Sequence, residues 1–565
     1  MRRRISGAQV AAGQSSGDDG DNGGSAGGYV DNVFSTYVYD GSSGQSTEIQ
    51  NGIDLAGEGG MVWTKTRSGD SWNHVIHDTE QGPNKQIAPN SSAAQTTETM
   101  LRAFNSDGYS LGPQTEVNNK NQTYASWTFR KARSFFDVVT YTGTGEVQEI
   151  PHNLGVKPGM IIIKCTTQAY PWAVYSRGLG NDYYLILNEP SEAIGPVGTW
   201  NRTDPTETHF TVSGGNSVNG DTNAEYVAYV FAHDDTEEGM IQCGTYTGTG
   251  ATDNEIDLGW EPQWVMIKGA TTAKSWLMFD SMRGVTSGSN DALLYANLSS
   301  AEELRNNWLS FNPNGFTLSG TTNTGMVAAH NGSGEQYIYM AIRRPNKPAE
   351  EFEADELFAM DTRDGTAPAY TSDFPVGMSL KKVHSRGDGY ISGRLTQGRI
   401  FRSNTEAPIA DALGYNYDYQ DGYYHQTSEN PDDQSWMWRR APGFFDCGVY
   451  QGSDSAGLRP HGLGAIPEMI WIKRQALDPN GSLFYQNWHV YHKNLRVQET
   501  GYTAVCYLNN DGSQNNASVY KPSEFTADEW YLGTDNRQNK SGELYSVFMW
   551  ASVPGICDIG TYTGN

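Results

Sequence analysis

Positive charge is scarce in this sequence of 565 residues. Only 39 Lys and Arg stand against 65 Asp and Glu, which gives a formal net charge of -26. Such a chain repels phosphate backbones and anionic lipids, so its composition disfavours a nucleic-acid partner. Long apolar runs are missing as well, because stretches such as "MIIIK" end far short of the roughly 20 residues that a spanning helix needs. We therefore expect no membrane insertion, and "MRRRISGAQVAAGQSSG" at the start lacks the apolar segment of an export signal.

Cysteine is equally sparse. The five cysteines are scattered without C-x-x-C spacing, which argues against a disulfide scaffold or a zinc ribbon. They are Cys165, Cys243, Cys447, Cys506 and Cys557. Three of them, Cys243, Cys447 and Cys557, come just before the tyrosine motif described below. A small apolar residue would fill an equivalent core position there.

Catalytic motifs do not occur. The sequence has no G-x-S-x-G, P-loop or H-E-x-x-H pattern, and its carboxylates are too abundant for any pair to be singled out. The pairs His74 with His77 and His489 with His492 are three residues apart. On a strand this spacing points the two rings to opposite faces, so one zinc ion could not bind both. We predict a protein that is not an enzyme, with no catalytic residue, no cofactor and no metal site.

An internal repeat dominates what is present. The stretch "TYTGTG" occurs twice, and related strands place Tyr39, Tyr141, Tyr246, Tyr450 and Tyr562 in register. The spacings between these tyrosines are 102, 105, 204 and 112 residues, so the third interval holds two units. The start of the hidden unit lies near "ELFAMDTRDG", the most divergent copy.

These landmarks divide the chain into an arm and a series of units. Residues 11–28 are Gly, Ser and Asp without aromatic or β-branched residues, which is typical of a flexible arm. The predicted divisions are the arm 1–29, units 30–132, 133–241 and 242–350, the divergent unit 351–442, unit 443–555, and the first strand of a sixth repeat at 556–565. An orphan first strand leaves backbone groups unpaired, so we expect the sequence to be part of a longer chain.

The composition of the landmarks predicts an all-β fold. Each unit repeats short aromatic or β-branched segments separated by Gly, Asn, Asp and Pro turns, which indicates antiparallel sheets. Segments such as "MIIIK" and "EMIWIK" are apolar on consecutive residues, so they should be central strands covered on both faces. The glycines of "TYTGTG" then form the turn that follows the opening strand. We predict a tandem array of antiparallel β-sandwich units, of a jelly-roll or lectin-like kind.

Two residue types recur at fixed places in the units. Lysines end the segments of the "MIIIK" type, and we interpret them as charges at the exit of a strand to solvent. They are Lys65, Lys164, Lys268 and Lys473. Tryptophans recur in the next strand at Trp72, Trp172, Trp276 and Trp488. These rings could be platforms for sugars, but their place in an apolar strand favours core packing.

The divergent unit adds a run rich in tyrosine, "GYNYDYQDGYYHQ". Tyrosine combines a flat apolar face with a hydroxyl group at low entropic cost, which suits sugars and protein contacts alike. The run is therefore a candidate for either glycan binding or an interface with neighbouring units or another subunit, and we favour the interface. Its members are Tyr415, Tyr417, Tyr419, Tyr423 and Tyr424.

Long stretches carry a family resemblance. The runs "TYASWTFRKARSFFDVVTYTGTG" and "IQCGTYTGTGATDNEIDLGWEPQWVMIKGAT" resemble a repeat family of unassigned function found in virion structural proteins of tailed, mainly marine, bacteriophages. The resemblance covers about 30–350 well, 443–565 moderately and 353–442 poorly. It implies a tail-fibre or other appendage protein, located in the virion after assembly in the host cytoplasm. It brings no assigned catalytic residues.

The resemblance also implies partners. We expect other virion or tail proteins, a homo-oligomeric assembly and, if the protein attaches to a host, a host surface glycan. Two alternatives stay open: a capsule- or polysaccharide-degrading enzyme on the same kind of appendage, and a secreted lectin-like adhesin.

Overall fold

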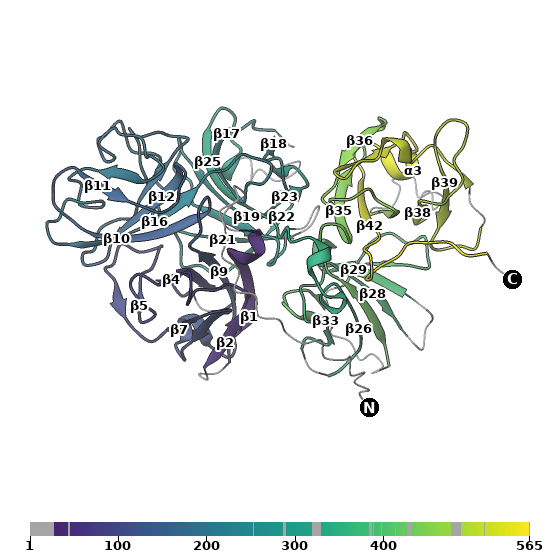
Figure 1. The fold of residues 1–565 in the computed structure, drawn as a ribbon, viewed down its shortest axis with the longest axis horizontal. Helices are drawn as coiled ribbons and strands as arrows, with labels where there is room; N and C mark the ends of the chain where they lie inside the picture. The colour runs from purple at the N-terminus through teal and green to yellow at the C-terminus, as the bar shows by residue number, and fades with distance from the viewer. Residues whose placement is uncertain are drawn as a thin grey trace, which may run out of the picture.

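A computed structural model describes residues 28–563 except 43–45, 70, 252–253, 286–289, 319–328, 366, 384–386, 388, 397, 413, 426–431, 476–486 and 513–514. The predicted arm therefore lies almost entirely outside the described residues. The chain forms two lobes (Figure 1). Units 1 to 3, coloured purple to teal, make the first lobe, and units 4 and 5, green to yellow, make the second.

The fold is all-β and antiparallel, as predicted. We call the first strand of each unit the opening strand, the last strand the closing strand and the "MIIIK" segment the central strand. In every unit the closing strand lies between the opening strand and the central strand, and the fourth strand pairs with the other edge of the central strand. The opening strands are β1 (Phe34–Asp40), β10 (Phe136–Thr142), β17 (Ile241–Thr247), β26 (Phe358–Thr362) and β35 (Phe445–Gln451). The closing strands are β9 (Thr123–Arg130), β16 (Glu225–Ala232), β25 (Gln336–Arg343), β34 (Gln434–Trp438) and β42 (Leu544–Trp550).

The same sheets continue through the central and fourth strands. The central strands are β3 (Gly60–Thr66), β12 (Pro158–Cys165), β19 (Pro262–Gly269), β28 (Met378–Lys382) and β37 (Met469–Arg474). The fourth strands are β4 (Val75–Asp78), β13 (Ala173–Ser176), β20 (Leu277–Asp280), β29 (Gly389–Gly393) and β38 (His489–His492). In four units further strands extend this edge: β14 (Leu185–Ile186), β21 (Asn290–Tyr295), β22 (Glu303–Asn306), β30 (Arg399–Arg402), β31 (Ala410–Asp411), β39 (Ala504–Tyr507) and β40 (Asn515–Asn516).

A second, smaller sheet completes each sandwich. The smaller sheets have the orders β2-β8-β7, β11-β15, β18-β24-β23, β27-β33-β32 and β36-β41. Their strands are β2 (Thr47–Gln50), β7 (Leu101–Asn105), β8 (Gly108–Leu111), β11 (Gln148–Pro151), β15 (His209–Val212), β18 (Asn254–Asp257), β23 (Leu309–Asn312), β24 (Gly315–Leu318), β27 (Tyr370–Thr371), β32 (Tyr415–Asn416), β33 (Gly422–His425), β36 (Gly457–Pro460) and β41 (Glu529–Leu532). Unit 1 adds the pair β5 (Lys85–Gln86) and β6 (Thr96–Thr97). The α-helices α1 (Thr115–Asn118) and α3 (Asn536–Asn539) have one turn each, and no helix of the described residues could span a membrane.

The central strands are covered on both faces in the first lobe. Every residue of β3, β12 and β19 is buried. One face of each strand points into its own sandwich. The other face contributes to one continuous core that joins units 1, 2 and 3, with Trp63, Ile162 and Met266 among its members. The second lobe has a corresponding core shared by units 4 and 5.

The tyrosine motif is a repeated packing device. The opening-strand tyrosine stacks on a closing-strand tyrosine in four units, with ring centroids 5.0 to 5.2 Å apart: Tyr39 on Tyr124, Tyr141 on Tyr226, Tyr246 on Tyr337 and Tyr450 on Tyr545. The glycine two residues later is required by a close approach of two backbones. A Cβ at Gly143 would lie 2.4 Å from the carbonyl oxygen of Asp221, and one at Gly248 would lie 2.1 Å from that of Gly332.

This close approach can be tested by substitution. We expect Gly143→Ala to lower the free energy of unfolding by about 2 kcal/mol or more, because the new methyl group meets a backbone atom that cannot move aside. Gly198→Ala in the same unit is the matched control, since a Cβ there has no atom within 4 Å. Chemical denaturation of both variants measures the difference. Equal stabilities would show that the turn does not need glycine at this place.

Candidate functional site: the junctions between units

The recurrent lysines lie inside the protein, so the prediction that they exit to solvent is wrong. Each is fully buried: Lys65, Lys164, Lys268 and Lys473 all have 0% exposure. The end of the central strand that carries the lysine lies beside the preceding unit along the chain, or beside unit 3 in the case of unit 1. The strand therefore ends at a junction and not at the surface.

Backbone carbonyl groups surround these ammonium groups. Lys268 donates to the carbonyl oxygen of Gly269 at 2.7 Å and, across the junction, to that of Pro190 in unit 2 at 3.2 Å. Lys473 donates across its junction to the carbonyl oxygen of Thr405 in unit 4 at 3.5 Å. Burial lowers the pKa of Lys268 and of Lys473 to about 7, and that of Lys65 and of Lys164 to about 8.

An indole group crosses each junction beside the lysine. Trp276 of unit 3 donates to the carbonyl oxygen of Ile186 in unit 2 at 2.9 Å, and Trp488 of unit 5 donates to that of Arg402 in unit 4 at 2.8 Å. Trp172 of unit 2 likewise donates to the carbonyl oxygens of Ala88 and Ser91 in unit 1, at 3.1 and 3.0 Å. The prediction of core packing is confirmed for these three tryptophans, which are at most 1% exposed.

Unit 1 uses a histidine in this place. Trp72 is only half-buried, and His74 directly precedes β4 as Trp172 precedes β13. The backbone N–H of His74 donates to the side chain of Asn90, as that of Trp172 does to Asn188. His74 Nε2 lies 3.0 Å from the carbonyl oxygen of Tyr295 in unit 3. The alignment of Trp72 with the other tryptophans is therefore corrected to His74.

One backbone hydrogen bond repeats at every junction. Its donor is a backbone N–H of one unit. Its acceptor is the carbonyl oxygen of the residue two positions after the buried lysine of the adjoining unit. The four bonds are Gln95 to Thr166, Ala193 to Ala270, Ile409 to Gln475 and Glu302 to Arg67, at 2.8 to 3.1 Å. The last of them joins unit 3 back to unit 1. Units 1, 2 and 3 thus form a closed ring with the same junction at each step.

Buried ion pairs reinforce the closure of the ring. Arg67 of unit 1 contacts Glu302 of unit 3 and Asp418 of unit 4, both at 2.9 Å. Arg283 contacts Glu302 at 3.1 Å and Asp280 at 2.6 Å. Burial alone would raise the pKa of Glu302, but Arg67 and Arg283 outweigh it and hold that pKa below its usual value.

A second ion-pair cluster joins the two lobes. Arg440 of unit 4 contacts Glu261 of unit 3 and Asp446 of unit 5, each at 2.7 Å. Arg344 contacts Asp446 at 3.0 Å. Burial alone would raise the pKa of Asp446, but the two guanidinium groups hold it well below its usual range. The Asp446 carboxylate therefore stays charged, and Glu261 and Asp446 both contact arginines across unit boundaries.

The tyrosine-rich run lies mostly in the core of unit 4. Tyr415, Tyr417 and Tyr423 are at most 4% exposed and stack on one another, and Tyr417 lies within 2.6 Å of the Ser379 hydroxyl. Tyr424 is half-buried against the same core. These rings therefore face their own sandwich, and the structure does not present the first three to a sugar.

Tyr419 alone in the run lies towards another unit. It is half-buried, and burial together with the carboxylates of Asp40 in unit 1 and Asp418 raises its pKa to about 12. The carbonyl oxygen of Tyr419 accepts from Arg394 at 3.2 Å, and the next residue, Gln420, donates to the carbonyl oxygen of Thr36 in unit 1. This end of the run lies at the boundary between units 1 and 4.

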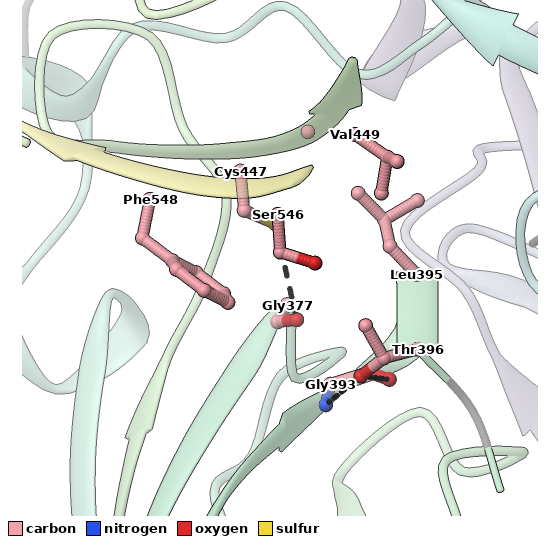
Figure 2. Close-up of a pocket in the computed structure, with 9 residues that line it drawn as sticks. Gly377, Gly393, Leu395, Thr396, Cys447, Val449, Ser546 and Phe548 are labelled. Atoms are coloured by element: carbon pink, nitrogen blue, oxygen red, sulfur yellow. Dashed lines mark hydrogen bonds between the residues drawn. The ribbon is translucent and has the colours of Figure 1, made fainter. Parts of the chain in front are cut away.

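A small apolar hollow lies at the junction of units 4 and 5 (Figure 2). Gly377, Gly393, Leu395 and Thr396 line it from unit 4, and Cys447, Val449, Ser546 and Phe548 from unit 5. Its cavity volume of about 10 Å³ is room for about one water molecule, far below the range of about 300–1,000 Å³ typical of ligand sites. Burial raises the pKa of Cys447 to about 12, so its thiol is not a nucleophile at neutral pH.

The described residues contain no group of three or more His, Cys, Asp and Glu side chains that could hold a metal ion. His77 and His489 are buried, and burial lowers the pKa of each to about 3. Both imidazoles are therefore neutral at physiological pH and behave as core residues. Of the three cysteines expected in a core position, Cys243 and Cys447 are buried and Cys557 is half-buried.

A family model covers most of this architecture. The model of a domain of unknown function, DUF7483, matches residues 30–345 and 435–565. The chain belongs to the DUF7483 family. The match leaves out 346–434, which is nearly all of unit 4, so the unit that diverges in sequence is also the one outside the DUF7483 match. A comparison with curated proteins finds no match.

The lysines and tryptophans of the junctions stand out in the sequence, but the sequence pattern does not place them between units. The lysine and the tryptophan were both recognised as recurrent, but recurrence alone does not distinguish a strand end at solvent from one beside another unit. The signal that could have decided it is the apolar face of the central strand opposite the sandwich core. Both faces of "MIIIK" are apolar, so a second layer must cover the outer one.

The buried lysines make stability depend on pH. The pKa of Lys268 is lowered in the folded protein, so between about pH 7 and its unfolded value near 10.5 the unfolded chain binds more protons. The free energy of unfolding due to this group therefore rises with pH from about 7 upward, and the cost of the buried charge is fully present below pH 7.

We expect Lys268→Met to remove this contribution. At pH 6.5 the variant should have a higher free energy of unfolding than the wild type. This difference between the two proteins should shrink by more than 1 kcal/mol by pH 8.5. Urea denaturation of both proteins across this range measures the difference, and the solvent-exposed Lys120→Met is the control. An advantage that is constant with pH would contradict a lowered pKa at Lys268.

Proposed function

We propose that this protein is a structural component of a tailed-phage virion, a tail fibre or other appendage, in which the ring of units acts as a rigid scaffold. The resemblance of the runs around "TYTGTG" to virion structural proteins supports the proposal. So does the architecture, because a closed ring of sandwiches that share one core forms a rigid scaffold whose surface loops are available for recognition.

The closed ring of units 1 to 3 is the observation that carries the scaffold role. Its repeated polar groups are directed inward, to carbonyl groups of the neighbouring unit. Lys268 and Trp276 illustrate this, since both donate to unit 2. A site that serves turnover would instead expose titratable groups to a substrate in a cleft.

Host attachment is the adhesive part of the proposal. Unit 4 is its best location, because it departs most from the other units and lies outside the family match. Tyr419 and Tyr424 are the half-buried tyrosines of its tyrosine-rich run. A host surface glycan is the proposed ligand, and a homo-oligomer is the proposed form of the appendage.

Two other functions remain as outcomes of the same test. A polysaccharide-degrading appendage enzyme would release reducing ends from host capsule. A secreted lectin-like adhesin would occur free in cultures without phage.

Mass spectrometry of purified virions is the deciding experiment. We expect the protein in stoichiometric amounts in particles that have been banded twice by density, and no release of reducing ends when the protein is incubated with host capsule or lipopolysaccharide. Absence from the particles would contradict the virion role, and sustained turnover would favour the enzyme.

The attachment role needs a surface substitution. We expect Tyr419→Ala to leave particle assembly normal and to lower host adsorption several-fold. Tyr417→Ala is unsuitable, because this ring is buried and contacts Ser379, so the change would destabilise unit 4. Gly365→Ala, where a Cβ would have open space, is the control in the same unit. Normal adsorption of the Tyr419 variant would contradict a role of this residue in attachment.

A further inference from the structure

The second lobe repeats the junction of the first lobe but has only two units. The indole N–H of Trp488 in unit 5 donates to a carbonyl oxygen of unit 4, as that of Trp276 in unit 3 does to one of unit 2. The backbone hydrogen bond from Ile409 to Gln475 matches that from Ala193 to Ala270. In the first lobe the same junction closes a ring of three units. The geometry of the second lobe therefore corresponds to a ring with two of its three positions filled.

The opening strand of unit 4 shows one border of the third position. Met360 pairs with Trp436 on the closing strand. The residues in the corresponding register of the other units are Thr36, Val138, Cys243 and Cys447, and all are at most 5% exposed because a neighbouring unit covers them. Met360 is 61% exposed. An apolar side chain thus faces solvent where the first lobe has a unit-to-unit contact.

The outer edge of unit 5 shows the other border. Leu508 donates its N–H to the carbonyl oxygen of Trp488, as Leu187 does to Trp172 and Ala296 does to Trp276. Leu187 and Ala296 are fully buried, whereas Leu508 is 37% exposed. The preceding residue, Tyr507, pairs with His489 and so corresponds to Ile186 and Tyr295, whose carbonyl oxygens contact the indole of Trp276 and the imidazole of His74.

The apolar face between these borders is only partly covered. Leu380 and Trp436 of unit 4 and Met469 and Trp471 of unit 5 are half-buried. Their counterparts in unit 2, such as Ile162 and Tyr229, are at most 2% exposed. The face therefore continues the interface between units 4 and 5 without the third layer that the first lobe provides.

The segment after unit 5 begins as an opening strand does. The bridge between Val553 and Cys557 repeats those between Ala132 and Phe136 and between Ala441 and Phe445, which precede β10 and β35. Ile559 is 6% exposed, in the place of Val138, whereas Tyr562 is 96% exposed, in the place of the stacked Tyr141. The segment thus lies against unit 5, and among the described residues no closing strand pairs with it.

We propose that the third position of the second lobe binds a β-sandwich unit of the DUF7483 type, which uses residues 557–562 as its opening strand. The unit covers Met360 and Leu508 and donates an indole or imidazole N–H to the carbonyl oxygen of Tyr507. Its contact with unit 4 lacks the hydrogen bond from an indole or imidazole, because Gly389 occupies the position at which the other units have tryptophan or histidine. The proposal is independent of the virion role.

The test extends the full chain with a unit that is known in this structure. Residues 249–345 of unit 3 are joined after Gly564, so that Tyr562 takes the place of Tyr246. Single cysteines at Met360→Cys and Leu508→Cys report on the two borders, and Leu458→Cys is the control, a side chain 45% exposed on the smaller sheet of unit 5. Maleimide labelling is read by peptide mass spectrometry, so that the five native cysteines are distinguished.

We expect the extension to slow labelling at 360 and 508 at least ten-fold and to leave labelling at 458 unchanged. The same extension with Trp276→Ala in the appended unit should protect position 508 less. Two results would overturn the proposal. In the first, the appended unit resists protease and is therefore folded, but positions 360 and 508 label at their former rates. In the second, the appended unit stays sensitive to protease although its binding face on the second lobe is available. Equal protection by both extensions would overturn the indole contact to Tyr507.

Discussion

The outer face of the central strand imposes the constraint on which the rest of the structure depends. A strand that is apolar on both faces cannot lie at the surface of a single sandwich, so each unit must bury that face against others. Three units accomplish this by closing a ring, and their residues merge into one core. The lysine that ends the strand is then buried as a consequence, and carbonyl groups of its own and the neighbouring unit replace water around its ammonium group.

The polar groups of the junction add specificity to this apolar association. An indole such as that of Trp276 fixes the distance and register of two units, because it must reach one carbonyl oxygen. The ion pairs between the lobes work differently. Arg440 and Arg344 lie between carboxylates of units 3 and 5, so the pairing is satisfied only in one arrangement of the lobes. Buried pairs of this kind are weak evidence for stability, because the cost of desolvating the charges can exceed their attraction.

Much of the fold was predictable from sequence because the units repeat. The antiparallel fold and the central place of "MIIIK" followed from recurring apolar segments, and the turn glycines from "TYTGTG". The burial of Lys268 was not predictable in the same way, since it depends on a neighbouring unit whose contacting residue, Pro190, is 78 residues away in the chain. The tyrosines of unit 4 show the opposite error: the sequence predicts an interface or a glycan site for Tyr417 and Tyr423, but β33 and its neighbours place them in the core of their own unit. Alternation within so short a run does not say which face is inside.

The central claim is that units 1, 2 and 3 are one cooperative body closed by equivalent junctions. Hydrogen exchange of the intact chain, resolved by peptide, measures the opening free energy of each central strand. The account predicts that β3, β12 and β19 exchange with the same opening free energy, and that β28 and β37 of the second lobe exchange faster. A difference of more than about 2 kcal/mol among β3, β12 and β19 would contradict it, because the units would then open one at a time.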